Sequence, residues 1–150
     1  CADCVFEPPA DPAGRARLAM AAARAAAQLA GEKARVRFLA GPATEDAVGA
    51  AAVTAFEALA PGIPAGLDTR LTLDGPDPRF RGRADVLIFP SSTAGHLALS
   101  AVRSLAGARV LGPLLLGVPA VVAGTLPDAD DAEIAGTAAL GILLAGGTKT

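Results

Sequence analysis

The sequence predicts an α/β protein with a mostly parallel sheet and helices on both of its faces. Short apolar runs alternate along the chain with longer helix-forming segments, which is the order that βαβ units produce. The apolar run that ends at Phe89 is uninterrupted, as in a parallel strand that is covered on both faces. Right-handed crossovers between such strands then bring the helices against the sheet.

The length and charge limit the classes of protein to consider. A chain of 150 residues is sized for one domain whose core buries about 70% of the unfolded surface. We therefore expect residues 1–150 to form a single α/β domain. A net charge of −2, without a basic stripe or an aromatic platform, predicts no nucleic-acid partner. No apolar stretch has the length of a membrane span, so a cytoplasmic protein with no membrane partner is expected.

The first predicted elements are a strand and a helix. Ala2–Phe6 forms a short strand. A helix over Pro12–Ala30 follows, because Asp11 offers an N-cap, Pro12 favours the first helical position and Gly31 ends the pattern. Three arginines of this helix are expected to face water, and phosphate binding is the less favoured alternative for them: Arg15, Arg17 and Arg24.

The middle of the chain predicts one further strand, one helix and an irregular segment. Arg35–Leu39 alternates charged and apolar residues, which predicts the second strand. Gly41-Pro42 breaks it, and a helix over Thr44–Ala60 follows with early acidic residues. Pro61–Arg83 is rich in Pro, Gly, Asp and Arg. We expect it to be irregular, with at most a short strand at Leu67–Leu73.

The last third resumes the alternation. The run that ends at Phe89 is followed by a helix through Leu105. Strands are expected at Ala108–Leu111 and Pro119–Ala123. The last helix begins at Asp130, has Glu133 at capping-box spacing and is closed by Gly146-Gly147.

The junction after Phe89 is the first candidate site. Pro90 stops the strand, and Ser91, Ser92 and Thr93 can cap the helix that follows. Free N–H groups and the helix dipole favour anions at such strand-to-helix junctions. Gly95 and the only histidine, His96, follow. His96 either forms a Ser–His couple with the hydroxyl residues or makes local hydrogen bonds.

Other motifs are absent or ambiguous. The chain has no G-x-S-x-G elbow, Walker A motif or dinucleotide glycine pattern. Cys1 and Cys4 have C-x-x-C spacing, but no second pair completes a zinc site. Capping is a better explanation than metal binding for the acidic cluster at the start of the last helix. We predict no metal site. The cluster is Asp128, Asp130, Asp131 and Glu133.

The segment from Ala84 to Pro119 resembles the phosphate acetyltransferase and phosphate butyryltransferase family. Its members carry a segment like A-D/N-V-L-I-F-P-D-x-x-A-G-N, then a helix, then G-A-x-x-I-G-P-I-L-x-G and a proline. The corresponding segments here are Ala84–His96, Gly107–Gly117 and Pro119, in the same order and without a gap. Ala2-Asp-Cys-Val and Arg35–Leu39 also look like the second half of a family member.

The resemblance implies a fold, a reaction and a set of site residues. The fold would be an isopropylmalate-dehydrogenase-like lobe, here corresponding to the C-terminal half, usually in a homodimer. The reaction would move an acetyl or short acyl group between coenzyme A and inorganic phosphate. Coenzyme A would be a substrate, with no bound cofactor and no metal. The implied catalytic residues are His96 and Asp130, and the implied substrate-binding residues are Ser91, Ser92, Thr93, Gly95, Gly112, Pro113 and Thr125.

The chain departs from the family at several of these positions. Ser91 replaces the loop aspartate, and His96 replaces the asparagine after the glycine. Thr125 lies where the family has a Ser-Arg pair. The family's acid near the last helix corresponds to Asp128, Asp130 or Asp131, among which the sequence does not choose.

These departures leave three hypotheses open. The first is an acyltransferase, either a fragment of a longer enzyme or a diverged member. The second is a non-catalytic paralogue that acts as a ligand-binding or regulatory module. A domain of the related dehydrogenase architecture is a third reading, for which the sequence has no nucleotide fingerprint.

Overall fold

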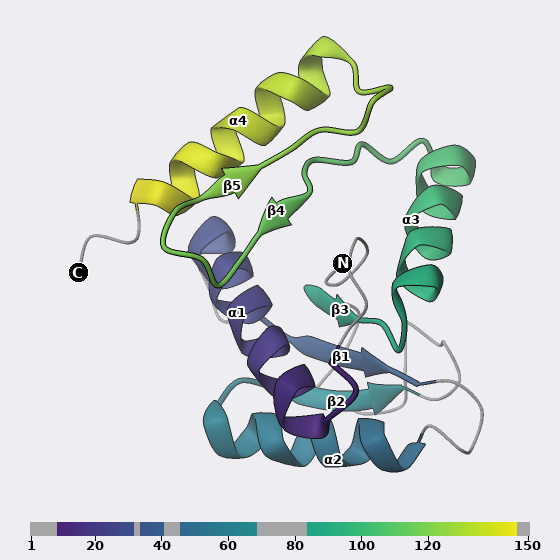
Figure 1. The fold of residues 1–150 in the computed structure, drawn as a ribbon, viewed down its shortest axis with the longest axis vertical. Helices are drawn as coiled ribbons and strands as arrows, with labels where there is room; N and C mark the ends of the chain where they lie inside the picture. Colours follow the sequence, from purple (N-terminus) through teal and green to yellow (C-terminus); the bar gives the residue numbers. More distant parts are fainter. Residues whose placement is uncertain (1–8, 32–33, 41–45, 69–83, 147–150) are drawn as a thin grey trace. The chain divides into compact units, whose positions relative to one another are not determined.

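The computed structural model describes residues 9–31, 34–40, 46–68 and 84–146 (Figure 1). The chain divides into two compact units, residues 1–99 and 100–150, and each is described by itself. The first unit holds α1 (Pro12–Ala30), β1 (Val36–Leu39), α2 (Asp46–Leu59), β2 (Ala65–Asp68) and β3 (Val86–Ile88). The second holds β4 (Leu114–Leu115), β5 (Val122–Ala123) and α4 (Asp131–Gly146). Helix α3 (Ser92–Ala106) begins in the first unit and ends in the second. The single domain expected from the sequence stays a prediction.

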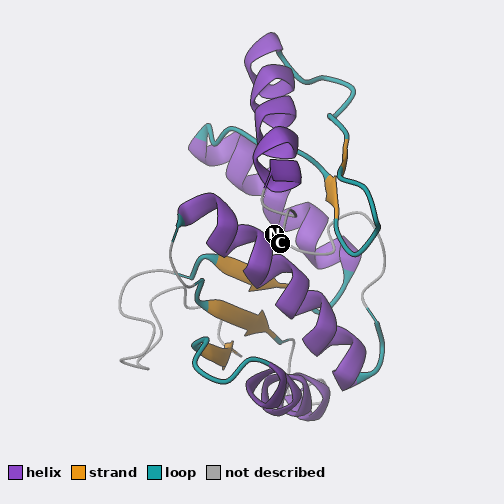
Figure 2. Ribbon diagram, turned by 90° about the vertical axis from the view of Figure 1, so that its left-hand side faces the viewer, coloured by secondary structure: helices purple, strands orange, loops and turns teal. Residues whose placement is uncertain are grey.

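The first unit is built on a parallel sheet of order β2-β1-β3, whose strands are labelled in Figure 1 and coloured orange in Figure 2. In β1, Val36 pairs with Ala65 of β2 on one side and Val86 of β3 on the other. At the amino ends of β1 and β3, the Arg35 guanidinium contacts the Asp85 carboxylate, with 3.0 Å between Nε and Oδ2. The predicted α/β class with a parallel sheet is therefore confirmed.

Helix α1 has the termini that the sequence predicts. The Gly14 amide donates a hydrogen bond of 2.7 Å to Oδ1 of Asp11, which is the N-cap. Gly31 ends the helix at φ +73° and donates its amide proton to the Ala27 carbonyl. A positive φ favours glycine because it has no Cβ to clash with the backbone.

Alanine and phenylalanine make up most of the core of the first unit, together with Val36, Val86 and Ile88. One face of α1 buries Ala16, Ala19 and Ala23, whose small side chains let the helix lie close to α2 and the sheet. Phe56 of α2 meets Phe38 of β1 edge to face, with 6.0 Å between the ring centroids, an arrangement that aromatic rings favour. Phe6 and Phe80 lie outside the described residues.

Helix α2 comes close to the side chain of Leu67 in the sheet at a glycine. A Cβ added to Gly49 would come within 2.7 Å of Cδ1 of Leu67 in β2. Helix α2 and strand β1 confirm the helix and the strand expected in this region. The expected start of the helix at Thr44 lies outside the described residues. So do the strand Ala2–Phe6 and most of the segment Leu67–Leu73.

The second unit contains an antiparallel hairpin. Leu114 of β4 pairs with Ala123 of β5, and the Gly124 amide donates a hydrogen bond to the Pro113 carbonyl at 2.8 Å. The expected strand over Pro119–Ala123 is therefore reduced to Val122–Ala123, and its partner strand is antiparallel.

The prediction of a strand at Ala108–Leu111 is wrong. Within the described part of the chain this segment has no sheet partner. Its backbone amides turn to α4 instead: Val110 donates to Oε1 of Glu133 at 3.4 Å, and the next glycine, Gly112, donates to Oγ1 of Thr137. Side chains thus satisfy the donors that a neighbouring strand would take.

Helix α4 begins as predicted. The Glu133 amide donates to Oδ1 of Asp130 at 2.7 Å, and the Asp130 amide donates to Oε2 of Glu133 at 3.3 Å. These reciprocal bonds are a capping box. None of the helices in the described ranges is long and apolar enough to cross a membrane.

Candidate functional site

The sheet topology points to the carboxyl ends of β1 and β3. From β1 the chain continues through α2 to β2 on one side, whereas β3 lies on the other side of β1 and continues into α3. Strand order therefore reverses between β1 and β3. In open α/β sheets, ligands bind outside the carboxyl ends of the strands at such a switch point. The segment from Phe89 to Ser91 leaves β3 at this edge.

Ser91 is the N-cap of α3. Its Oγ accepts a hydrogen bond from the Ala94 amide at 3.2 Å, and its carbonyl accepts one from the Gly95 amide at 3.1 Å. Of the three hydroxyl residues expected to cap this helix, Ser91 does so, while Ser92 and Thr93 form the first turn. The positive end of the helix dipole is therefore directed at the edge of the sheet where a ligand is expected.

His96 lies exposed on α3, one turn after Ser92. Gly95 beside it is buried. Among the hydrogen bonds of the described residues, none joins His96 to Ser91, whose Oγ serves the helix cap. The imidazole is thus accessible to a ligand at the start of α3, and the structure does not show a Ser–His couple there.

Arg15 does not simply face water, so this part of the prediction for α1 needs correction. Its Nε donates to the Pro9 carbonyl at 3.0 Å, and its Nη2 donates to the Pro90 carbonyl at 3.2 Å. Arg17 and Arg24 are exposed, as expected. Sequence patterning missed the position of Arg15 because the Pro90 contact spans 75 residues.

The second unit holds the predicted residues Gly112 and Pro113. The Gly112 amide is buried and donates to Oγ1 of Thr137 at 2.9 Å. Gly112 has φ +111°, and a Cβ added to it would lie 3.2 Å from the Leu114 amide nitrogen. Only glycine adopts this conformation without strain. The Gly112–Pro113 peptide bond is cis.

The acidic residues around the start of α4 form a structural network. Arg103 contacts Asp128 through Nη1 and Glu133 through Nη2, each at 3.1 Å. The hydrogen bond with Asp128 raises the pKa of Arg103, and the same bond lowers the pKa of Asp128. Capping and ion pairing thus engage this cluster, in agreement with the capping interpretation. Sequence analysis did not find Arg103, because nothing in its surroundings predicts an acid 25 or 30 residues later.

The predicted site residues fall into two groups. The loop residues Ser91, Ser92, Thr93, Gly95 and His96 lie together at the start of α3 in the first unit. The remaining four belong to the second unit, where Thr125 follows β5 and is exposed, and Asp130 caps α4. They are Gly112, Pro113, Thr125 and Asp130. In the described ranges, no group of three His, Cys, Asp or Glu side chains could hold a metal ion.

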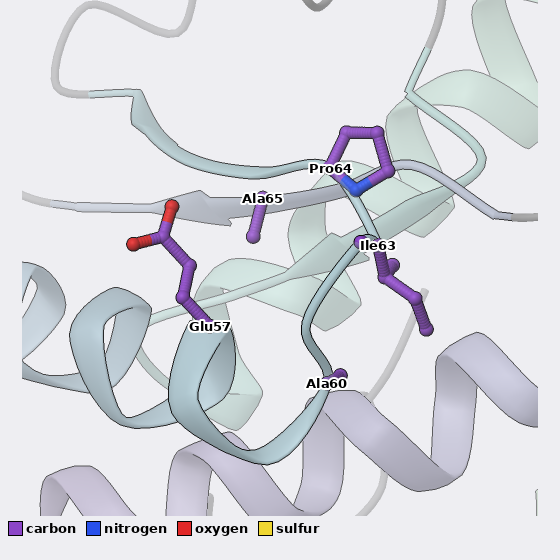
Figure 3. Close-up of a pocket in the computed structure, with 6 residues that line it drawn as sticks. Glu57, Ala60, Ile63, Pro64 and Ala65 are labelled. Carbon is purple, nitrogen blue, oxygen red and sulfur yellow. The ribbon is translucent and has the colours of Figure 1, made fainter.

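A surface hollow of about 330 Å³ lies elsewhere on the first unit (Figure 3). Glu57 and Ala60 at the end of α2 line it, together with Ile63, Pro64 and Ala65 at the entrance to β2. Ala65 begins β2, so the hollow is at the amino ends of the parallel strands. It is therefore separate from the carboxyl edge, where α/β sheets bind ligands.

Comparisons with known proteins agree on one family. The family model described as "Phosphate acetyl/butaryl transferase" matches residues 67–142. The EutD phosphotransacetylase from Staphylococcus aureus is similar in structure, with a TM-score of 0.76 and 23% identity over 95% of this chain and 48% of that one. A phosphotransacetylase from Streptococcus pyogenes has a TM-score of 0.83 and 18% identity over 98% of this chain and 49% of that one. The chain spans about half the length of these two proteins.

Proposed function

Because the chain belongs to the phosphate acetyl/butyryl transferase family, we propose that it takes part in acyl transfer between coenzyme A and inorganic phosphate. The family match covers 67–142 and so includes the Ser91–His96 loop, the Gly112–Pro113 turn and the start of α4. The Ser91–His96 loop carries the proposal. It caps a helix at the switch point of a parallel sheet, where an anionic substrate is favoured.

In the proposed reaction, inorganic phosphate displaces coenzyme A from the acyl group. An oxygen of inorganic phosphate attacks the carbonyl carbon of the acyl thioester, and the C–O bond forms. The tetrahedral intermediate then expels the sulfur, which leaves as coenzyme A thiolate and takes up a proton. In the reverse direction a base removes the thiol proton before sulfur attacks the acyl phosphate. The protein must stabilise negative charge on the phosphate and on the carbonyl oxygen.

We assign the phosphate to the start of α3. The dipole of the helix favours an anion there, and its first turn carries amides directed out of the helix. Ser91 holds the turn in shape through Ala94 and Gly95. The hydroxyl group of Ser91 and that of Thr93 are the further donors that we assign to phosphate oxygens.

We assign proton transfer to His96. It is exposed one turn into the same helix, and an imidazole exchanges protons near neutral pH. Asp130 is the second candidate, although its carboxylate also accepts the Glu133 amide. Gly112, Pro113 and Thr125 are assigned to substrate binding, with the Thr125 hydroxyl as a donor. The expected homodimer and the cytoplasmic location belong to this proposal as well.

The proposal is tested by supplying acetyl-CoA and phosphate and measuring free thiol. The chain is assayed alone and with the remaining half of a family member supplied in trans, since it spans about half of the related structures. We expect thiol release that depends on phosphate. Comparison of the rates with acetyl-CoA and butyryl-CoA then defines the acyl preference. No release above background in either format would contradict the proposal.

His96→Gln separates the role of the imidazole from that of the loop. Glutamine keeps a polar side chain at the position but transfers no proton near pH 7, and it is not the asparagine that family members carry there. We expect kcat to fall by a factor of about 10² to 10⁴, the usual contribution of general acid–base catalysis. Arg109→Gln is the matched control, because Arg109 is exposed and outside the assigned site. Unchanged turnover in His96→Gln would contradict the assignment of proton transfer to His96.

A ligand-binding module without catalysis is the second candidate function. The observation that favours it is the structural engagement of the acids, since Asp130 caps α4 and Asp128 pairs with Arg103. The chain has no arginine beside Thr125, where the family has a Ser-Arg pair, and this favours the same function. Calorimetric titration with coenzyme A, acetyl phosphate and inorganic phosphate tests it. Binding without turnover would favour this function, and no binding would exclude it.

A further inference from the structure

Arg15 joins two parts of the chain that are distant in sequence. The guanidinium donates to the Pro9 carbonyl just before α1 and to the Pro90 carbonyl just after β3, at 3.0 and 3.2 Å. Both acceptors belong to residues without an N–H, so the chain on either side has fewer backbone bonds available to fix it. One side chain therefore fixes the entry to α1 and the exit from β3.

The Pro90 carbonyl is directly followed by the N-cap of α3. Ser91 holds the first turn of the helix from within, through bonds with Ala94 and Gly95. Arg15 holds the preceding peptide from outside, through a charge-assisted bond, which is stronger than a bond between neutral groups. Hydrogen bonds therefore hold the chain on both sides of the Pro90–Ser91 peptide bond.

We propose that Arg15 is a positioning residue, which aims Ser91 and the first turn of α3 at the substrate phosphate. This inference rests on the proposed function, because it concerns the orientation of the same loop. Arg15 acts through the Pro90 carbonyl and is not itself assigned to the reacting atoms. A displacement of about 1 Å in such a loop lowers rates on the order of 100-fold when the geometry of attack depends on it.

A general structural role is the competing explanation for the same contacts. Arg15 belongs to α1, whose neighbouring residues Ala16 and Ala19 are in the core, so its removal could loosen the whole first unit. The two explanations differ in where the effect appears. A positioning role changes the loop at the start of α3 first, whereas a general role changes α1 and the sheet equally.

The test compares Arg15→Gln and Arg15→Lys with the control Arg24→Gln. Arg24 is exposed on the same helix, so its replacement makes the same change in charge. Lysine keeps the charge and one donor group, but its point charge does not bridge two carbonyls as a planar guanidinium does. We expect Arg15→Lys to recover part of any loss and Arg24→Gln to behave as the wild type.

Amide hydrogen exchange is the readout that does not need activity. In Arg15→Gln we expect the Ala94 and Gly95 amides to exchange about tenfold faster, because local opening of the loop becomes easier. The core amides of α1 and β1 are expected to change less than twofold. Equal acceleration in the loop and in α1 would overturn the positioning role, and so would no acceleration in the loop.

Kinetics and phosphate titration supply the second readout. For an active wild type, we expect Arg15→Gln to raise KM for inorganic phosphate and lower kcat/KM about 10- to 100-fold, while KM for acetyl-CoA changes less than threefold. An unchanged kcat/KM would overturn the inference. If the wild type neither turns over nor binds inorganic phosphate, the proposed function fails. The exchange pattern then decides separately whether Arg15 fixes the loop.

Discussion

The Gly112 amide donates a buried hydrogen bond of 2.9 Å to the hydroxyl oxygen of Thr137. Thr137 lies one turn after Glu133 on α4, and Glu133 accepts the Val110 amide. A single face of α4 therefore fixes the backbone from 110 to 112, immediately before the Gly112–Pro113 turn of the predicted site. This turn owes its shape to a helix that follows it by about 20 residues in the sequence.

Replacement of Thr137 by valine tests this relationship. Valine has nearly the shape of threonine but no hydroxyl oxygen, so the buried Gly112 amide would lose its acceptor. We expect the free energy of unfolding to fall by about 1–3 kcal/mol, the cost of an unsatisfied buried donor. Urea denaturation measures the loss. Thr137→Ser keeps the acceptor and should retain most of the stability; equal losses in both variants would contradict this account.

Replacement of Phe56 by alanine tests the packing of the core of the first unit. The Phe56 side chain is fully buried and packs edge to face on Phe38. Phe56→Ala is expected to lower the free energy of unfolding by about 3–5 kcal/mol, because a large cavity remains among small neighbours. Leu59→Ala, at an exposed position of the same helix, should cost much less. Similar values for the two variants in chemical denaturation would show that α2 is not packed as described.

Asp130 has a structural role and a proposed catalytic one, which two variants separate. Asparagine is as good an N-cap as aspartate, whereas alanine is not. Asp130→Ala should therefore lower the free energy of unfolding by about 1 kcal/mol, and Asp130→Asn should lower it far less. If Asp130 transfers a proton, both variants lose activity. Full activity in Asp130→Asn would limit Asp130 to the cap.

The Arg103–Asp128 pair predicts a weak dependence of stability on pH. Its hydrogen bond lowers the pKa of Asp128 below the ordinary value of 3.8. The stabilisation is therefore present above that ordinary value and is lost as the pH falls through the lowered one. We expect a small stability difference between the wild type and Asp128→Asn at pH 7 that shrinks in acid and in 1 M salt, because both groups are partly exposed. If the stability difference between the wild type and Asp128→Asn grew in acid, the lowered pKa of Asp128 would be contradicted.

Local sequence signals predicted the elements that local interactions determine. Asp11, Pro12 and Gly31 define α1 through contacts within a few residues, and Asp130 with Glu133 does the same for the start of α4. The strand Val86–Ile88 and the helix capped by Ser91 were also predictable, because an apolar run ends at a proline before a good cap.

Long-range contacts decided the features that the sequence did not predict. The segment Ala108–Leu111 has the residues of a strand, yet the side chains of Glu133 and Thr137 satisfy backbone donors at Val110 and Gly112. The sequence predicts that Arg15 faces water, yet its guanidinium donates to the Pro90 carbonyl 75 residues away. Arg103, for which the sequence contains no signal, pairs with Asp128 25 residues away. Periodicity contains no information about such pairings.

The most direct measurement of the proposed function follows both products of one reaction. Acetyl-CoA and inorganic phosphate are incubated with the chain, with the other half of a family member supplied in trans, and acetyl phosphate is followed by phosphorus NMR while free thiol is titrated. We predict that acetyl phosphate and thiol appear in equal amounts, at a rate that His96→Gln lowers and Arg109→Gln does not. Thiol release without acetyl phosphate, or neither product, would contradict acyl transfer to phosphate.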